Sequence, residues 1–252
     1  MKVTLIFLKM DKRKLEDLYE LAKKTAVNAG KFLLSRKNQI LEIYSEEGRD
    51  IKLEIDRETE ELIRENLSPT KITILGEELG VDDYKTEFMW VIDPLDGTSN
   101  YFRGIDQCCV SIALMHFQKV KIGVIFNFNT NELFCACENK GAYLNDKHIK
   151  VSKIRNKVKA TLTSGFPASE RLDSSMKYLK DFIGWKKIRM FGSAALSCAY
   201  VASGKCDVYK EKGVYLWDFA AGVCLVEEAG GKAAYEKIDD SRYSVNFTNG
   251  RL

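Results

Sequence analysis

Long apolar runs, histidines and strings of basic residues are all scarce in this 252-residue chain. The apolar run at residues 3–8 is too short for the core of a signal peptide or for a membrane span. Only His116 and His148 could supply imidazole ligands, and Cys135 and Cys137 follow strand alternation rather than zinc-ligand spacing, so a zinc site is not expected. No basic run is interleaved with aromatic residues, and a nucleic-acid partner is therefore not indicated.

Cysteine occurs in an odd number, seven, and most of the cysteines lie among apolar residues. This pattern is typical of reduced core cysteines in a cytosolic protein. The content of 45% hydrophobic and 30% charged residues predicts a sizeable core, in one globular domain or two intimate subdomains. A formal net charge of +3 is compatible with a small anionic substrate.

Several segments have the periodicity of regular structure. Apolar residues at three- and four-residue intervals predict a helix over residues 11–37, whereas residues 44–50 indicate a polar, mobile loop. Alternation predicts a strand over residues 51–56 and then a helix over 57–67, with Asp56 most simply a helix cap and otherwise a carboxylate for a third metal. Further strands are expected at 71–75, 108–116, 120–128, 132–137, 157–166 and 188–191, and further helices at 171–183, 193–203 and 217–229.

The stretch at residues 93–98 has the sequence Asp-Pro-Leu-Asp-Gly-Thr and follows an apolar, strand-like run. A strand that ends at Asp93 would hold this carboxylate rigidly, and Asp96 could converge with it on one hard cation. Gly97 permits close approach of the backbone to a ligand, and the N–H groups around Thr98 would face an anion at a helix start. The alternative for this stretch alone is an acidic turn with a good helix cap.

Three other places could contribute to the same site. Glu77 closes the predicted strand at 71–75, and two acidic strand ends favour a shared site over separate solvated acids. Small residues at Gly192 and Ser193 permit either close approach of a ligand or tight packing of the helix that follows. Asp218 lies in the first turn of a predicted helix, where capping alone could explain a carboxylate.

The chain contains Gly-Glu-Glu at residues 76–78, Asp-Pro-Leu-Asp-Gly-Thr-Ser-Asn-Tyr at 93–101, Trp-Asp-Phe-Ala-Ala-Gly at 217–222 and Glu-Ala-Gly-Gly at 228–231. In this order the motifs resemble the inositol monophosphatase family of magnesium-dependent, lithium-sensitive phosphatases, over nearly the whole chain. The resemblance implies an α/β (α+β) fold, a layered αβαβα sandwich of the inositol monophosphatase and fructose-1,6-bisphosphatase type. It further implies one catalytic domain over residues 1–252, with a metal-binding half at about 10–150 and a substrate-contributing half at about 151–252.

The resemblance also implies a site, residue by residue. Two or three Mg²⁺ ions would be held by Glu77, Asp93, the backbone carbonyl of Leu95, Asp96 and Asp218, with Asp56 at a weaker third metal. In the implied catalytic group of Glu77, Thr98 and Asp96, the first two would orient and deprotonate a metal-activated water for direct attack on phosphorus. The implied substrate contacts are Gly97 and Thr98 for the phosphate and, for the alcohol, Asp96, Gly192, Ser193, Ala194, Glu211 and Asp218.

The implied function is hydrolysis of a small polyol or sugar phosphate in the cytoplasm, by a homodimer. Myo-inositol 1-phosphate is the default substrate, because Glu211 suits a hydroxyl-rich leaving group. Fructose-1,6-bisphosphatase and 3′(2′),5′-bisphosphate nucleotidase are the alternatives within the superfamily. A different class is an interaction partner of the transcription machinery, since some family members have that role, although the intact set of acids argues against loss of catalysis.

Three departures from the family pattern stand out. Leu53 replaces a frequent threonine before Asp56, which puts the third metal site in doubt. Asp106 stands where a proline is usual. The sequence ends at Leu252, where relatives commonly continue into a helix, so packing or dimer contacts on that face are expected to differ.

Overall fold

Two β-sheets and the helices packed on them make up the part of the chain that the structure, a computed structural model, describes: residues 12–37, 43–47, 50–82, 87–166 and 178–252. The larger sheet has eight strands in the order β10-β9-β8-β7-β6-β5-β3-β4. Only β3 and β5 run parallel in it, and every other pair is antiparallel. Its strands are β3 (Thr73–Gly76), β4 (Gly80–Val81), β5 (Phe88–Asp96), β6 (Cys109–His116), β7 (Lys119–Asn127), β8 (Glu132–Cys137), β9 (Gly141–Leu144) and β10 (Lys147–Ile149).

The smaller sheet has five strands in the order β12-β11-β13-β15-β14. Here β11 runs parallel to both β12 and β13, and the other pairs are antiparallel. Its strands are β11 (Thr161–Thr163), β12 (Lys187–Arg189), β13 (Val208–Tyr215), β14 (Lys232–Lys237) and β15 (Arg242–Thr248), with the short 3₁₀ turn η2 (Lys157–Lys159) before β11.

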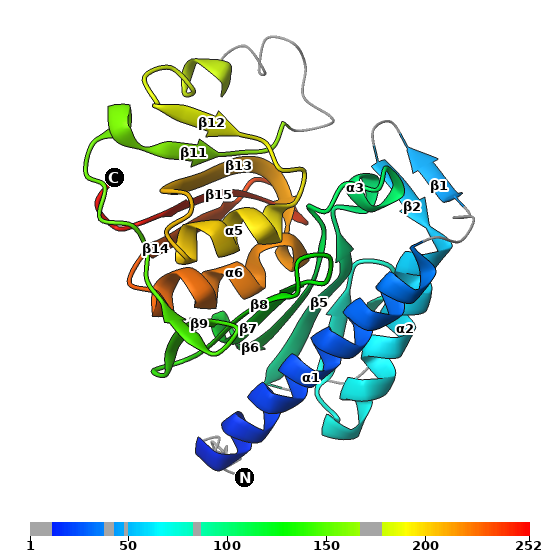
Figure 1. Cartoon of the computed structure of the whole chain (residues 1–252). Coiled ribbons are helices and arrows are strands. Elements are labelled where there is room, and N and C mark those ends of the chain that lie inside the picture. Colours follow the sequence, from blue (N-terminus) through cyan, green and yellow to red (C-terminus); the bar gives the residue numbers. More distant parts are fainter. Residues whose placement is uncertain (1–11, 38–42, 48–49, 83–86, 167–177) are drawn as a thin grey trace.

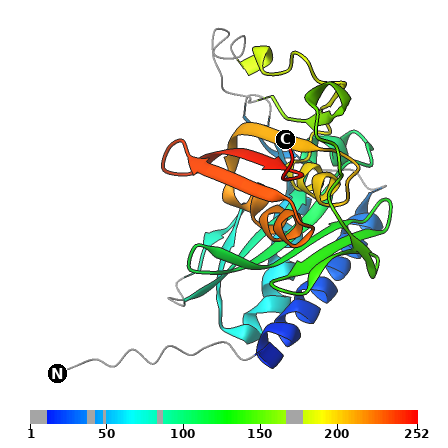
Figure 2. The same cartoon turned by 90° about the vertical axis from the view of Figure 1, so that its left-hand side faces the viewer.

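Helices separate and cover the sheets (Figures 1 and 2). On one face of the larger sheet lie α1 (Lys12–Arg36) and α2 (Glu54–Leu67), the latter followed by the 3₁₀ turn η1 (Ser68–Thr70). The other face packs on α5 (Ala194–Ala202) and α6 (Leu216–Glu228), which also contact the smaller sheet. The layered α/β sandwich that the sequence predicts is thus confirmed. The expected helix at 171–183 lies partly outside the described residues, which resume at 178.

The predicted apolar stripe explains how the first helix packs. Ala22, Ala26, Ala29 and Leu33 are completely buried, on the side of α1 that faces the larger sheet. Small side chains there let the helix lie close to β7, since a Cβ on Gly30 would come within 2.6 Å of the Phe126 ring. The prediction of a helix at this position is confirmed.

Some predicted boundaries are wrong. The expected loop at 44–50 is a hairpin for the residues described, because β1 (Ile43–Glu47) pairs antiparallel with β2 (Asp50–Leu53). The strand expected to reach Asp56 ends at Leu53, and α2 starts at once, so that Asp56 lies inside the first helical turn. No helix among the described residues is long and apolar enough to cross a membrane.

Candidate active site

A β-bulge in β5 brings Asp93 and Asp96 to the same face of the larger sheet. Residues three apart on a regular strand point to opposite faces. Against β6, however, Asp93 pairs with Ser111 and Asp96 with Cys109, so three steps on β5 match two on β6. With the extra residue, Asp96 reaches the start of α5 and Asp93 lies near Asp218 at the start of α6. The strand therefore extends through the Asp-Pro-Leu-Asp motif instead of ending at Asp93 as predicted.

Asp96 is bound to the start of α5. Its carboxylate accepts hydrogen bonds from the Ser193 hydroxyl, from Ala194 N at 3.2 Å and from Ala195 N at 2.8 Å. Burial raises the pKa of Asp96, and these donors oppose the rise. Ser193 caps the helix, as its hydroxyl also accepts from Leu196 N at 3.2 Å. Three of the predicted substrate-contact residues thus meet at one helix start.

Glu77 and Asp218 join Asp93 and Asp96 in a group of four acids. Because β3 runs parallel to β5 with Gly76 beside Ile92, Glu77 leaves the sheet at the same edge as Asp93. Asp218 lies in the first turn of α6 and accepts a hydrogen bond from Tyr215 N at 2.7 Å. Burial raises the pKa of Asp93 well above its usual range, and the charges of Glu77, Asp96 and Asp218 add to the rise.

The pKa of Asp218 is likewise raised well above its usual range, by burial and then by the charges of Glu77 and Asp96. In the described part of the chain, no lysine or arginine forms an ion pair with Asp93, Asp96 or Asp218. Buried carboxylates cost free energy unless a positive charge or hydrogen-bond donors compensate them. The carboxylate oxygens of these four acids are the type of ligand that a hard divalent cation prefers. Among the described residues, however, no three His, Cys, Asp or Glu side chains are already arranged closely enough to hold a metal ion.

The phosphate-contact residues of the prediction follow directly after β5. Gly97 has a φ of 91°, a left-handed conformation that favours glycine, and begins the short helix α3 (Thr98–Phe102). A Cβ at Gly97 would also come within 2.8 Å of the carbonyl of Gln107. The Thr98 hydroxyl donates to the Leu95 carbonyl at 3.0 Å, so a predicted catalytic hydroxyl and a predicted metal-ligand carbonyl are in contact.

Asn100 joins the loop after α3 to the loop before α5, a role that the sequence analysis missed. Its side-chain Nδ2 donates to the carbonyls of Gln107 and Phe191, each at 2.7 Å, and of Gly192 at 3.3 Å. Gly192 itself has a φ of 68°. The signal available in the sequence was an amide within the 93–101 motif, a residue type that must find several partners when buried.

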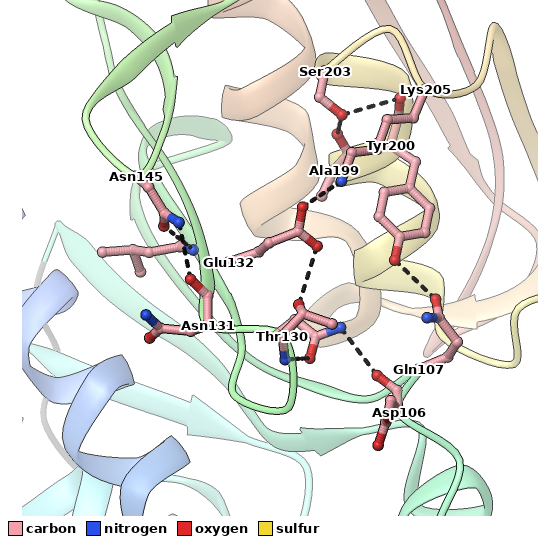
Figure 3. Close-up of polar contacts among 12 residues, drawn as sticks. Asp106, Gln107, Thr130, Asn131, Glu132, Asn145, Ala199, Tyr200, Ser203 and Lys205 are labelled. Atoms are coloured by element: carbon pink, nitrogen blue, oxygen red, sulfur yellow. Dashed lines mark hydrogen bonds and ion pairs between the residues drawn. The ribbon is translucent and has the colours of Figure 1, made fainter.

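The loop after α3 is held from outside the site (Figure 3). Tyr200 donates its hydroxyl proton to Gln107 Oε1 at 2.8 Å, and Asn127 Nδ2 donates to the Asp106 carbonyl at 3.1 Å. The Asp106 carboxylate forms an ion pair with Lys37 at 2.8 Å. This contact gives a structural reason for the aspartate at a position where proline is usual: it ties the loop to the end of α1.

Asp56 is a helix-capping residue, as its simplest interpretation predicts. Its Oδ2 accepts a hydrogen bond from Leu53 N at 2.8 Å, and its side chain is buried. The departure at Leu53 therefore leaves the cap intact, because the donor is the backbone. Burial, and after it the charges of Cys108 and Asp56, raise the pKa of Tyr101 to about 12, which places Asp56 near α3.

Glu211 lies on β13 and accepts hydrogen bonds from the same strand and from the segment that follows β11. The Tyr209 hydroxyl donates to Glu211 Oε2 at 2.9 Å, and the Gly165 backbone donates a further hydrogen bond. Burial raises the pKa of Glu211 to about 7, and the charge of Asp96 contributes to the rise. This contribution links Glu211 electrostatically to the acids at the end of β5.

A model of the inositol monophosphatase family matches residues 14–237. The chain is 40% identical over 221 residues to the Nus factor SuhB of Xylella fastidiosa, covering 82% of this chain and 78% of that protein. It is 37% identical over 201 residues to inositol monophosphatase 2 of Saccharomyces cerevisiae, covering 73% and 69%. The crystal structure of extragenic suppressor protein suhB from Bartonella henselae superimposes with a TM-score of 0.83, at 31% identity, covering 90% of this chain and 93% of that one.

Proposed function

The chain belongs to the inositol monophosphatase family, and from this premise we propose that it is a Mg²⁺-dependent, lithium-sensitive phosphomonoesterase. The proposed substrate is a small polyol or sugar phosphate, by default myo-inositol 1-phosphate, and the proposed setting is a cytoplasmic homodimer. One observation supports the proposal most: burial and mutual repulsion raise the pKa of Asp93 and Asp218 beside Glu77 and Asp96. Such an acid cluster is typical of a cation-dependent site.

The proposed metal ligands are Glu77, Asp93, the carbonyl of Leu95, Asp96 and Asp218, with Asp56 near a third ion. When bound, Mg²⁺ would supply positive charge that stabilises the phosphate ester as it reacts and makes water a better nucleophile. In this proposal Glu77 and Thr98 orient the attacking water and Glu77 takes its proton.

The chain's own residues also orient the substrate in this proposal. The backbone around Gly97 and Thr98 receives the phosphate, and Glu211 accepts hydrogen bonds from the alcohol. The start of α5, at Gly192, Ser193 and Ala194, lies where the alcohol would be bound. The Asn100 amide fixes this helix start against the loop that carries Gly97, so both parts of the substrate would meet a rigid surface.

Removal of divalent metal is expected to abolish phosphatase activity. The physical reason is that four neighbouring acids repel a phosphate ester unless cations neutralise both. Purified protein should be assayed with myo-inositol 1-phosphate after chelation, after Mg²⁺ is restored, and with added Li⁺ or excess Ca²⁺. We expect activity only with Mg²⁺, and inhibition by Li⁺ and by Ca²⁺, whose looser coordination suits an octahedral site poorly. Full activity in chelator would contradict the metal-ligand assignment.

The same assay distinguishes the alternatives when it includes fructose 1,6-bisphosphate and 3′-phosphoadenosine 5′-phosphate. A strong preference for either would reassign the chain within the superfamily. A relative bears the name Nus factor SuhB, which gives the second candidate, a partner of the transcription machinery. Co-purification of RNA polymerase without turnover of any ester would favour that candidate.

Glu211→Ala is expected to change substrate preference rather than abolish catalysis. Loss of an acceptor for the alcohol should lower kcat/KM for myo-inositol 1-phosphate by roughly 10- to 100-fold, the worth of a hydrogen bond to a charged group. Phenyl phosphate, whose leaving group has no further hydroxyl, should be hydrolysed almost as before. Glu236→Ala, at an exposed glutamate of β14, is the matched control. An equal loss on both esters would refute the proposed role of Glu211.

A further inference from the structure

The carboxylate of Glu211 is held by its neighbours in the smaller sheet. Tyr209 and Glu211 are two residues apart on β13, so their side chains leave the same face of the strand. The Tyr209 hydroxyl donates to Glu211 Oε2 at 2.9 Å. Gly165 follows β11 and packs directly against the carboxylate, since an added Cβ would lie 1.9 Å from Glu211 Oε1. Two groups, the Tyr209 hydroxyl and the Gly165 backbone, each donate a hydrogen bond to this carboxylate and restrict it.

Tyr209 is itself fixed in place. Its side chain is completely buried, and its ring meets Phe247 of β15 edge-on, with centroids 6.1 Å apart and an interplanar angle of 89°. The two residues are also direct partners in the strand pairing. A ring so packed can direct its hydroxyl to one position only, because rotation would displace core side chains.

We propose that Tyr209 is a positioning residue for substrate selection, whose hydroxyl orients the Glu211 carboxylate as an acceptor for the hydroxyl groups of the substrate alcohol. The proposal rests on the proposed function. A carboxylate has about four acceptor positions, and Tyr209 and Gly165 use two of them. With respect to the residues that the structure describes, about two positions stay open, which fits an alcohol with neighbouring hydroxyls.

The electrostatics of the pair agree with this role. Burial raises the pKa of Glu211 to about 7, and the hydrogen bond from Tyr209 opposes the rise. Loss of the hydroxyl would move Glu211 further toward the neutral acid, a weaker acceptor of hydrogen bonds than the carboxylate. Tyr209 would thus act on the substrate through Glu211, without contacting the substrate itself.

Tyr209→Phe tests the proposal, because it removes one oxygen and keeps the packed ring. We expect KM for myo-inositol 1-phosphate to rise roughly tenfold, about the worth of one hydrogen bond to a charged group, with kcat little changed. Both parameters for phenyl phosphate should stay at the wild-type values. The affinity of myo-inositol for protein saturated with Mg²⁺ and phosphate, measured by calorimetry, should fall by a similar factor.

Tyr178→Phe is the matched control. The Tyr178 hydroxyl is also buried and donates to the carbonyl of Lys210, between Tyr209 and Glu211, at 2.9 Å. Its loss disturbs the same strand and the Ser164 hydroxyl, which it contacts at 2.7 Å, but removes none of the hydrogen bonds described above on Glu211, and we expect no change in selectivity.

Three outcomes would overturn the assignment to Tyr209: unchanged kinetics in Tyr209→Phe, equal losses on both esters, or the same change of selectivity in Tyr178→Phe. Each of these leaves wild-type turnover of the polyol ester, and thus the proposed function, in place. A wild-type protein that neither hydrolyses the polyol ester nor binds the polyol overturns the proposed function and this assignment together.

Discussion

Asp93→Asn is expected to lower turnover by roughly 10³-fold or more in saturating Mg²⁺. Stabilisation by a bound metal ion is worth several kcal/mol, and each loss of about 1.4 kcal/mol is a factor of ten. Asp93 is also the acid on which the other three act, since the charges of Glu77, Asp96 and Asp218 all raise its pKa. Steady-state assays with myo-inositol 1-phosphate across a Mg²⁺ titration would measure the loss. Near wild-type turnover would remove Asp93 from the metal site.

The same variant should have the opposite effect on the metal-free fold. Because the folded-state pKa of Asp93 is raised, its ionised form destabilises the fold at high pH, and this cost disappears as pH falls through the folded pKa. Metal-free Asp93→Asn should therefore have a higher free energy of unfolding than the metal-free wild type near neutral pH. The difference should shrink as pH is lowered, whereas a depressed pKa would give the reverse trend.

Added Mg²⁺ should stabilise the wild type and Asp93→Asn to different extents. An ion that binds only the folded state raises its stability according to concentration and affinity, so the wild type should gain in melting temperature and Asp93→Asn should gain little. Asp207→Asn is the control, because Asp207 is buried and accepts from Thr161 N at 2.6 Å in the smaller sheet. We expect it to lose stability but to keep the response to Mg²⁺.

Where apolar periodicity was strong, the sequence predicted the fold well. The stripe on α1 appears where apolar residues recur at three- and four-residue intervals. The meander β6-β7-β8 appears where the sequence runs mostly apolar, because these strands are buried along most of their length on both faces. The smaller sheet was only partly predicted. Strand β14 is exposed along most of its length and rich in lysine, so it has no apolar alternation to detect. Strand β1 was missed because residues 45–47 are polar, whereas its partner β2 falls largely within the strand predicted over residues 51–56.

The site depends on features that appear only when distant segments meet. The bulge that aligns Asp93 with Asp96 is defined against β6, and one strand alone does not reveal an extra residue. The ion pair of Lys37 with Asp106 joins positions 69 residues apart. Asn100 likewise donates to carbonyls at 191 and 192. Local patterns predicted which acids gather, but the contacts that orient them are long-range.

Glu77→Gln and Thr98→Ala are each expected to lower turnover by roughly 10²- to 10⁴-fold, the usual contribution of a positioned general base. Glu77 comes from the end of β3, and Thr98 begins α3 after β5. The parallel pairing of β3 and β5 brings both segments to one sheet edge. In Thr98→Ala the Leu95 carbonyl also loses its hydroxyl donor. Inorganic phosphate should still inhibit both variants, since neither change removes the backbone around Gly97.

The double variant gives the sharper result. If both side chains act on one attacking water, removal of the second should cost little once the first is gone, because residues that act as a unit have non-additive effects. The double variant should thus be close in turnover to the slower single variant. Independent roles would instead multiply the two losses, to roughly 10⁴- to 10⁸-fold. That result, measured by single-turnover kinetics in saturating Mg²⁺, would favour attack by water without a base supplied by this pair.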